Sequence, residues 1–222
     1  MSLDAESLTD VVIINGPPGA GKGFLSGHYV AENLTAQHIS AGDLIRGIRS
    51  GDIDSEYSDT VLDCLESRSY LPDAVFGGVV LERVTKGHGT TDLSLLDAFP
   101  YGAGDFEYVK EGLILSKKRI LGAISLEATL DTCVSRMVYR GLRGGEAVRK
   151  SVISSEEVSE EEYFKKRYDS YGLAHDLLLD ILNRQNVIVK TIDVNSDILA
   201  EETRVEALAS FTEAITSLKS DN

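Results

Sequence analysis

The sequence has few residues of the kinds that mark secreted, membrane or zinc proteins. Only two cysteines occur among 222 residues, Cys64 and Cys133, and no Cys/His spacing is typical of a zinc site. No apolar run approaches the roughly 20 residues that a membrane-spanning helix needs. The start, MSLDAESLTD, lacks the basic and apolar parts of a signal peptide. We therefore expect reduced thiols, a cytoplasmic protein and a disordered lead-in over residues 1–9.

Positive charge is also scarce. There are 22 lysines and arginines against 36 aspartates and glutamates, which gives a formal net charge of −14. Proteins that bind nucleic acid usually carry a basic surface, so nucleic acid is excluded here as the main partner. Small phosphate ligands need only a local cluster of cations, so the places where basic residues gather carry information.

Short apolar, β-branched runs alternate with longer segments of helical periodicity. Strands are predicted at 10–16, 36–40, 93–99, 119–126 and 186–194, and helices at 21–34, 58–66, 73–85, 130–140, 160–183 and around 205–218. This alternation predicts an α/β fold in which a five-stranded parallel sheet has helices on both faces. We expect one domain over residues 10–222, with ligands at the carboxyl ends of the strands.

A glycine-rich loop, GPPGAGKGF, follows the first predicted strand and precedes a predicted helix. In that context glycines let backbone N–H groups turn toward phosphate oxygens at the positive end of the helix. Lys22 is placed to reach the outer phosphates. The usual loop has a hydroxyl residue after its lysine to hold magnesium, whereas this chain has Gly23 and Phe24. The alternative is a glycine turn with an incidental lysine.

Three more motifs follow in order: HISAGDLIR, LLDAFP and KKRYDSYGLAHDLL. With the glycine loop, they resemble the motifs of adenylate kinase and related nucleoside monophosphate kinases, over about residues 11–193. The resemblance implies a P-loop three-layer fold with two excursions, a monophosphate-binding insert at about 40–71 and a lid at about 141–159. It also implies a monomer that binds ATP, Mg²⁺ and a nucleoside monophosphate.

The resemblance implies roles for individual residues. Those assigned to the donor nucleotide are Gly16, Gly19, Ala20, Gly21, Lys22, Gly23, Phe24, Arg136 and Arg140. Those assigned to the acceptor are Ser40, Ala41, Arg46, Tyr101, Asp105 and Arg167. Lys22, Arg136, Arg140 and Arg167 are expected to act in catalysis, because phosphoryl transfer depends on positioning and charge neutralisation. Asp97 is expected to hold magnesium-bound water, and Asp43 to orient the segment around Arg46.

The chain departs from the family pattern at several positions. Phe24 replaces a threonine or serine, Tyr101 replaces a phosphate-binding arginine, and Asp105 stands where adenylate kinases have the glutamine that reads adenine. Relatives acting on UMP and CMP typically have alanine at the position of Ala41. A carboxylate at Asp105 only accepts hydrogen bonds, which predicts CMP above UMP, with AMP retained and GMP limited by pocket size. The alternative is that Asp105 faces solvent and reads nothing.

The resemblance therefore predicts an ATP-dependent nucleoside monophosphate kinase that produces two diphosphates. The alternative is a non-catalytic or weakly active nucleotide-binding protein on the same fold. A kinase for another small hydroxylated acceptor is a third interpretation, disfavoured by Arg46 and its motif. The four histidines, His28, His38, His88 and His175, show no metal-ligand spacing and are interpreted as exposed or capping side chains.

Overall fold

A computed structural model describes residues 9–67, 69, 71–86, 91–97, 99–100, 103–139, 160–195 and 201–221. The disordered lead-in was predicted over residues 1–9, but Thr9 is the first residue of a strand. Residues 1–8 and the predicted lid at 141–159 lie outside the described residues. Among the described helices, none has both the length and the apolar character that a membrane-spanning segment requires.

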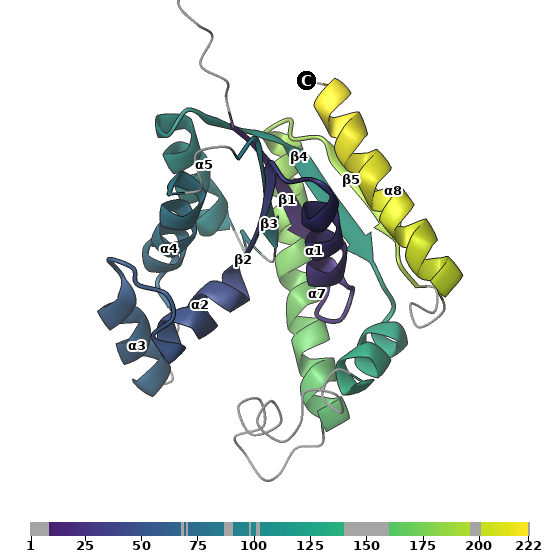
Figure 1. Cartoon of the computed structure of the whole chain (residues 1–222). Helices are drawn as coiled ribbons and strands as arrows, with labels where there is room; N and C mark the ends of the chain where they lie inside the picture. Colours follow the sequence, from purple (N-terminus) through teal and green to yellow (C-terminus); the bar gives the residue numbers. More distant parts are fainter. Residues whose placement is uncertain are drawn as a thin grey trace, which may run out of the picture.

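The centre of the molecule is one sheet of five parallel strands (Figure 1). The strands are β1 (Thr9–Asn15), β2 (Ala36–Ser40), β3 (Leu93–Asp97), β4 (Lys118–Glu127) and β5 (Val189–Asp193), in the spatial order β2-β3-β1-β4-β5. The chain goes from β1 to one side of the sheet for β2 and β3, and to the other side for β4 and β5. In open α/β sheets, ligands bind at the carboxyl ends of the strands beside such a switch point.

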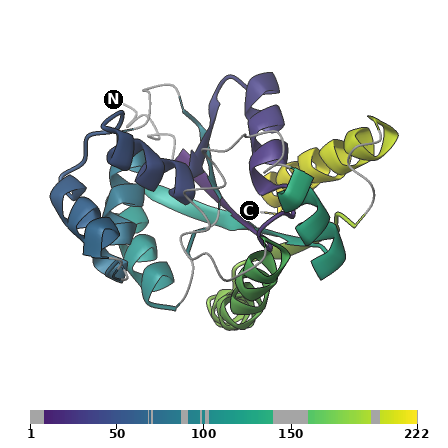
Figure 2. The ribbon, with the colours of Figure 1, turned by 90° about the horizontal axis from the view of Figure 1, so that it is seen from below.

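Helices cover both faces of the sheet, as predicted. The first face packs against α1 (Lys22–Glu32) and α8 (Glu201–Ser220), and the second against α4 (Asp73–Thr85), α5 (Ala103–Leu115) and α7 (Glu160–Arg184). Figure 2 shows α1 and α7 on opposite sides of the strands. Along β1, Val12 and Ile14 face α1 and α8, while Val11 and Ile13 face the other helices. Because both faces of the sheet are buried here, β1 contains a continuous run of apolar residues.

Two helices extend from the sheet between β2 and α4. They are α2 (Ala41–Ser50) and α3 (Ser58–Ser67), and they lie at one side of the molecule near α4 (Figure 1). Both lie within residues 40–71, and the role of this segment as a monophosphate-binding insert remains a prediction. A further helix covers residues 130–139 after β4.

An irregularity interrupts the pairing of β4 with β1. Val11 pairs with Ile120, but Val12 pairs with Gly122, so Leu121 is an extra residue in β4. Such a bulge shifts the inside–outside alternation of all residues that follow it in the strand.

The predicted elements needed three corrections. Helix α5 was not predicted at all. Leu34, predicted to belong to the first helix, lies beyond its end and is 92% exposed, because the helix closes at Asn33. Val205, predicted on the apolar face of the last helix, is 60% exposed, because α8 packs on the sheet only from Ala207 onward.

Candidate phosphate-binding site

The glycine loop lies between the end of β1 and the start of α1, at the switch point of the sheet. Gly19 and Gly21 have φ angles of 92° and 98°, a left-handed backbone that favours glycine. A Cβ at Gly19 would lie 2.5 Å from the carbonyl oxygen of Cys133, so the loop rests directly on the helix at 130–139. A Cβ at Gly21 would meet no atom of the described residues within 4 Å. The loop is therefore closely supported on one side and open on the other.

Cys133 itself serves packing. Burial raises the pKa of its thiol to about 11, although the positive charges of Arg136 and Lys22 oppose this shift. The thiol therefore stays protonated and unreactive at neutral pH. Both cysteines are free, as predicted, although Cys64 is only partly buried.

Lys22, the first residue of α1, closes the loop with its own side chain. Its Nζ donates to the carbonyl oxygens of Gly16 at 2.7 Å and Pro17 at 3.1 Å. Burial lowers the pKa of Lys22, while the nearby charge of Asp97 raises it and that of Arg167 lowers it. An ammonium group desolvated in this way interacts strongly with an anion, because little water competes.

Asp97 lies next to the loop at the carboxyl end of β3. It is 6% exposed, and its Oδ2 lies 3.1 Å from Nε2 of His38 in the neighbouring β2. A Cβ at Gly23 would lie 3.4 Å from the same carboxylate oxygen. The glycine after Lys22 thus places the loop backbone directly against the carboxylate predicted to hold magnesium.

The chemistry of this site fits a magnesium ion that arrives with its nucleotide. Magnesium usually keeps several waters and takes one or two carboxylates together with substrate phosphates. Asp97 supplies one such carboxylate. Among the described residues there is no group of three or more His, Cys, Asp or Glu side chains that could form a complete protein cage.

Phe24 stands at the position where the usual loop has a hydroxyl residue. Its ring lies 4.6 Å, centroid to centroid, from that of His28, and it packs against the core below α1. It offers no oxygen to a metal ion, so any magnesium at the loop depends on Asp97, water and phosphate.

Two of the predicted arginines lie around the loop. Arg136, in the helix at 130–139, donates to the carbonyl oxygens of Ala20 at 3.3 Å and Val194 at 2.5 Å. It therefore joins the loop to the end of β5. Arg167 in α7 is exposed and lies 6.0 Å above the ring of Tyr163, close enough for its charge to affect Lys22. Arg140 lies outside the described residues, and the roles predicted for all three arginines remain predictions.

Three of the predicted acceptor residues, Ser40, Ala41 and Arg46, lie in or next to α2. Ser40 caps the helix, because its hydroxyl accepts from the N–H of Asp43. The carboxylate of Asp43 in turn binds Arg46 at 2.5 Å. Burial alone would raise the pKa of Asp43, but the hydrogen bond and charge of Arg46 lower it below its usual value. Asp43 thus contacts Arg46, and Ala41 is buried. The orienting role expected of Asp43 remains a prediction.

Asp105 lies in the first turn of α5 and is 6% exposed. The alternative that it faces solvent is therefore wrong. Its reading of an acceptor base remains a prediction. Tyr101 lies outside the described residues.

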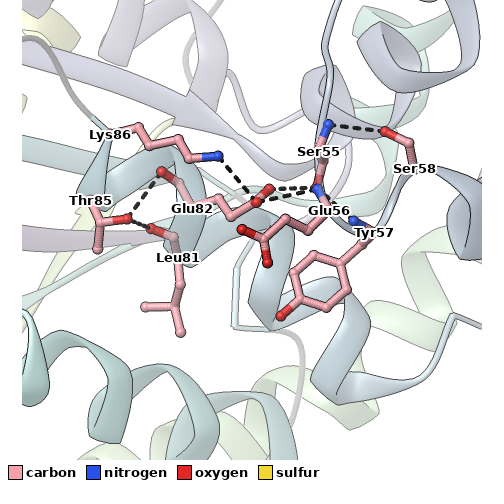
Figure 3. A network of polar contacts seen from close by, with 8 residues as sticks. All are labelled: Ser55, Glu56, Tyr57, Ser58, Leu81, Glu82, Thr85 and Lys86. Atoms are coloured by element: carbon pink, nitrogen blue, oxygen red, sulfur yellow. Dashed lines mark hydrogen bonds and ion pairs between the residues drawn. The ribbon is translucent and has the colours of Figure 1, made fainter.

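The helical insert is attached to α4 through one carboxylate (Figure 3). Glu82 accepts from the hydroxyl of Ser55 at 2.5 Å, from the N–H of Glu56 at 3.3 Å and from Lys86 at 3.3 Å. Burial alone would raise the pKa of Glu82, but these donors lower it. The loop before α3 is thereby fixed to a helix that packs on the sheet, and apolar side chains of α2 and α3 pack in one cluster with those of α4.

Sequence reasoning missed three polar residues near the loop. His38 contacts Asp97, and His175 in α7 lies 2.9 Å from the side chain of Asn15. His38 could have been found from strand order, since it sits on the same face as Asp97 in an adjacent parallel strand. The contact of Asn15 with His175 spans 160 positions and leaves no local signal.

Comparison with known proteins agrees with this geometry. The sequence model of the family described as adenylate kinase matches residues 14–187. Similar proteins include an adenylate kinase of Dehalococcoides mccartyi, 35% identical over 132 residues (58% of this chain and 58% of that protein). An adenylate kinase of Haloarcula marismortui is 33% identical over 130 residues, 57% of each chain. A UMP-CMP kinase of Lentinula edodes is 25% identical over 207 residues, 89% of this chain and 83% of that protein.

The match to the D. mccartyi protein covers less than two thirds of that protein's length. The match to the family model, in contrast, includes the end of β1, the glycine loop, Asp97 and α7. This chain therefore belongs to the adenylate kinase family.

Proposed function

We propose that this chain is an ATP-dependent nucleoside monophosphate kinase that transfers the γ-phosphoryl group of Mg²⁺-bound ATP to a nucleoside monophosphate. The products are two nucleoside diphosphates. The observation that carries the proposal is the position of Lys22 in a glycine loop whose backbone at Gly23 lies against Asp97, at the switch point of a parallel sheet. Family membership supports the same activity.

The reaction requires little covalent chemistry from the protein. An oxygen of the acceptor phosphate forms a bond to the γ-phosphorus, the bond from that phosphorus to the β–γ bridging oxygen breaks, and ADP leaves with the electron pair. Negative charge spreads over the transferred group, so catalysis consists of alignment and charge neutralisation. We assign the neutralisation to Lys22 and Arg167, with Arg136 supporting the loop from behind.

Magnesium, when bound with ATP, supplies further neutralisation and fixes the geometry of the phosphates. Asp97 is the residue that would hold it, and His38 holds one oxygen of Asp97 in place. On the acceptor side, Arg46 would bind the monophosphate through its two-pronged guanidinium. The insert at about 40–71 and the predicted lid at about 141–159 would then close and exclude water.

The acceptor base is assigned through Asp105. A buried carboxylate that meets a base edge accepts from the N4 amino group of cytosine, whereas uracil offers one N–H between two carbonyls. An unpaired buried polar edge costs about 1–3 kcal/mol, enough to rank acceptors. We therefore propose CMP above UMP, with AMP also accepted. The names of the relatives, adenylate kinase and UMP-CMP kinase, cover all three.

One observation favours a second function, a nucleotide-binding protein with little or no transfer activity. Phe24 packs against the core and His28, so it cannot replace the missing hydroxyl. Tyr101 also brings no positive charge where the family has arginine, and loss of such a charge can reduce phosphoryl transfer by about 10³-fold or more.

A coupled assay of ADP formation with AMP, CMP, UMP and GMP, run beside calorimetry with Mg²⁺-ATP, separates the two functions. Turnover with CMP ahead of UMP, changed by Asp105→Asn, supports the kinase and the assignment of the base. ATP binding without turnover of any acceptor supports the second function. Identical acceptor preference in wild type and Asp105→Asn would refute the role of Asp105.

The form that we propose is a cytoplasmic monomer, in line with the two free cysteines and with the family resemblance. Light scattering after size-exclusion chromatography, with and without ATP, would test the oligomeric state.

A further inference from the structure

A polar cluster connects the glycine loop to α7 on the side away from α1. Asn15, the last residue of β1, is 8% exposed, and its Nδ2 lies 2.9 Å from Nδ1 of His175. Its Oδ1 accepts from the N–H of Gly16, the first residue of the loop, at 2.8 Å. Tyr171, one turn earlier in α7, brings its hydroxyl to 2.8 Å from the same Nδ1. The rings of Tyr171 and His175 are stacked, with centroids 5.1 Å apart.

The direction of these hydrogen bonds follows from the backbone. The N–H of Gly16 can only donate, so the atom of Asn15 that faces it must be the carbonyl oxygen. The other atom is then the amide nitrogen, which carries only donors. Nδ1 of His175 must therefore accept from Asn15, which requires a neutral imidazole with its proton on Nε2.

We propose that His175 is a positioning residue for the phosphate-binding loop, and that its neutral form is the one that holds the loop for nucleotide binding. The imidazole holds the side chain of Asn15, and Asn15 holds the first N–H of the loop. The inference rests on the proposed function insofar as the loop binds nucleotide phosphates.

Protonation would break this arrangement in a defined way. A proton on Nδ1 turns the acceptor into a donor, which then faces the donor NH₂ of Asn15. The hydroxyl oxygen of Tyr171 can still accept from the protonated nitrogen. His175 would thus lose its contact with Asn15 and keep the one with Tyr171, and the loop would lose its attachment to α7 through Asn15.

The surroundings of His175 favour the neutral form at physiological pH. Burial lowers the pKa of His175 from its usual value near 6.5, and the carboxylates of Asp176 on α7 and Glu127 at the end of β4 offset part of this shift. Since the folded-state pKa lies below the unfolded one, the contribution of His175 to stability is complete above about pH 6.5 and decreases as the pH falls toward the folded-state pKa.

Two substitutions at His175 separate acceptor chemistry from packing. In His175→Asn, the side-chain oxygen can take the place of Nδ1 and accept from Asn15 without titrating. In His175→Phe, the ring volume remains but the acceptor is lost. The measurement is the Kd of Mg²⁺-ATP by calorimetry from pH 8.0 down to below the pKa of His175, which an NMR titration of its imidazole gives, with circular dichroism as a check on folding.

We expect the wild type to bind about three- to tenfold more weakly once His175 is protonated, as for the loss of one hydrogen bond. His175→Asn should lack this additional loss, and His175→Phe should bind weakly throughout. A phosphate group of the ligand titrates in the same range, so the ratio of Kd values between wild type and His175→Asn is the quantity to compare. A constant ratio across the range would overturn the positioning role while leaving the proposed kinase intact.

Asn15→Asp supplies a test that needs no nucleotide. The carboxylate still accepts from Gly16 but now requires a donor from His175, so it should raise the imidazole pKa above the wild-type value in an NMR titration. An unchanged imidazole pKa would show that the contact does not exist in solution. If wild type bound Mg²⁺-ATP at no pH, the proposed function would fail, and the inference with it, even with the expected NMR shift.

Discussion

Gly19 and Gly21 share a left-handed backbone but differ in their surroundings, and that difference leads to opposite expected phenotypes. Gly19→Ala would place its methyl group 2.5 Å from the carbonyl oxygen and 2.9 Å from the Cα of Cys133, so backbone would have to move. Gly21→Ala would place its methyl group where no described atom lies within 4 Å. Gly21→Ala is therefore the matched control for backbone strain without a steric clash.

The expected loss of stability follows from these two contributions. A non-glycine residue in a left-handed conformation costs about 1–2 kcal/mol, which applies to both variants. Overpacking adds about 1–3 kcal/mol for Gly19→Ala alone, for a total of about 2–5 kcal/mol. For a domain of this size each kcal/mol lowers Tm by about 2–4 °C. The expected decrease is thus about 2–8 °C for Gly21→Ala and about 4–20 °C for Gly19→Ala.

For Mg²⁺-ATP affinity we expect the reverse order, with the larger loss in Gly21→Ala. The methyl group of Gly21→Ala would point into the open side of the loop, where we place the phosphates, so Mg²⁺-ATP affinity should fall although the fold is nearly intact. Thermal unfolding and calorimetry on the two variants test both statements. Equal stability of the variants would refute the support of the loop by the helix at 130–139. Wild-type ATP affinity in Gly21→Ala would refute the position of the phosphates.

Three other predictions concern single side chains. Lys22→Ala should weaken Mg²⁺-ATP binding by about 10- to 100-fold, as for the loss of a charged hydrogen bond, and remove transfer; unchanged affinity in calorimetry would contradict the assignment of Lys22. Phe24→Thr should increase turnover or strengthen its dependence on Mg²⁺ with the fold intact, and identical magnesium titrations would show that the missing hydroxyl has no consequence. Glu82→Ala should lower the free energy of unfolding by about 1–3 kcal/mol at pH 7. Because donors hold the pKa of Glu82 below its ordinary value of 4.5, the difference from wild type should shrink as the pH falls below that value, and a pH-independent difference would exclude the carboxylate as its cause.

The sheet and the loop could be predicted because their signals are local. β-Branched runs mark the strands, and the glycine loop is one contiguous segment. Helix α4 was predicted with the bounds that the structure has. The five strands were all predicted, with ends displaced by up to three residues.

Helix α5 was not predicted, and propensity alone does not explain this, because α4 also contains two glycines and was predicted. In α5 the glycines are Gly104 and Gly112. The structure explains them. A Cβ at Gly112 would clash with Leu81 of α4, and one at Gly104 would lie 2.5 Å from the carboxylate of Asp73. Close packing against α4 therefore favours glycine at both positions and compensates for its weak propensity. The contacts of His38 and His175 were also missed, because their partners, Asp97 and Asn15, lie 59 and 160 positions away in the sequence.

The extra residue in β4 has a consequence at the far end of that strand. After Leu121, the residues of β4 are in the opposite phase, so Ala123 pairs with Ile13 and Ser125 with Asn15 on the face covered by α7. Glu127 lies two positions further on, and therefore on the same face, and its charge acts on His175. Regular pairing of Leu121 with Val12 would instead turn Ser125 and Glu127 toward α1, so the bulge keeps one of the two carboxylates that act on His175 on the side of α7. Deletion of Leu121 would remove the bulge without changing this arrangement, because Gly122 would then follow Ile120 directly, and Ser125 and Glu127 would keep their face.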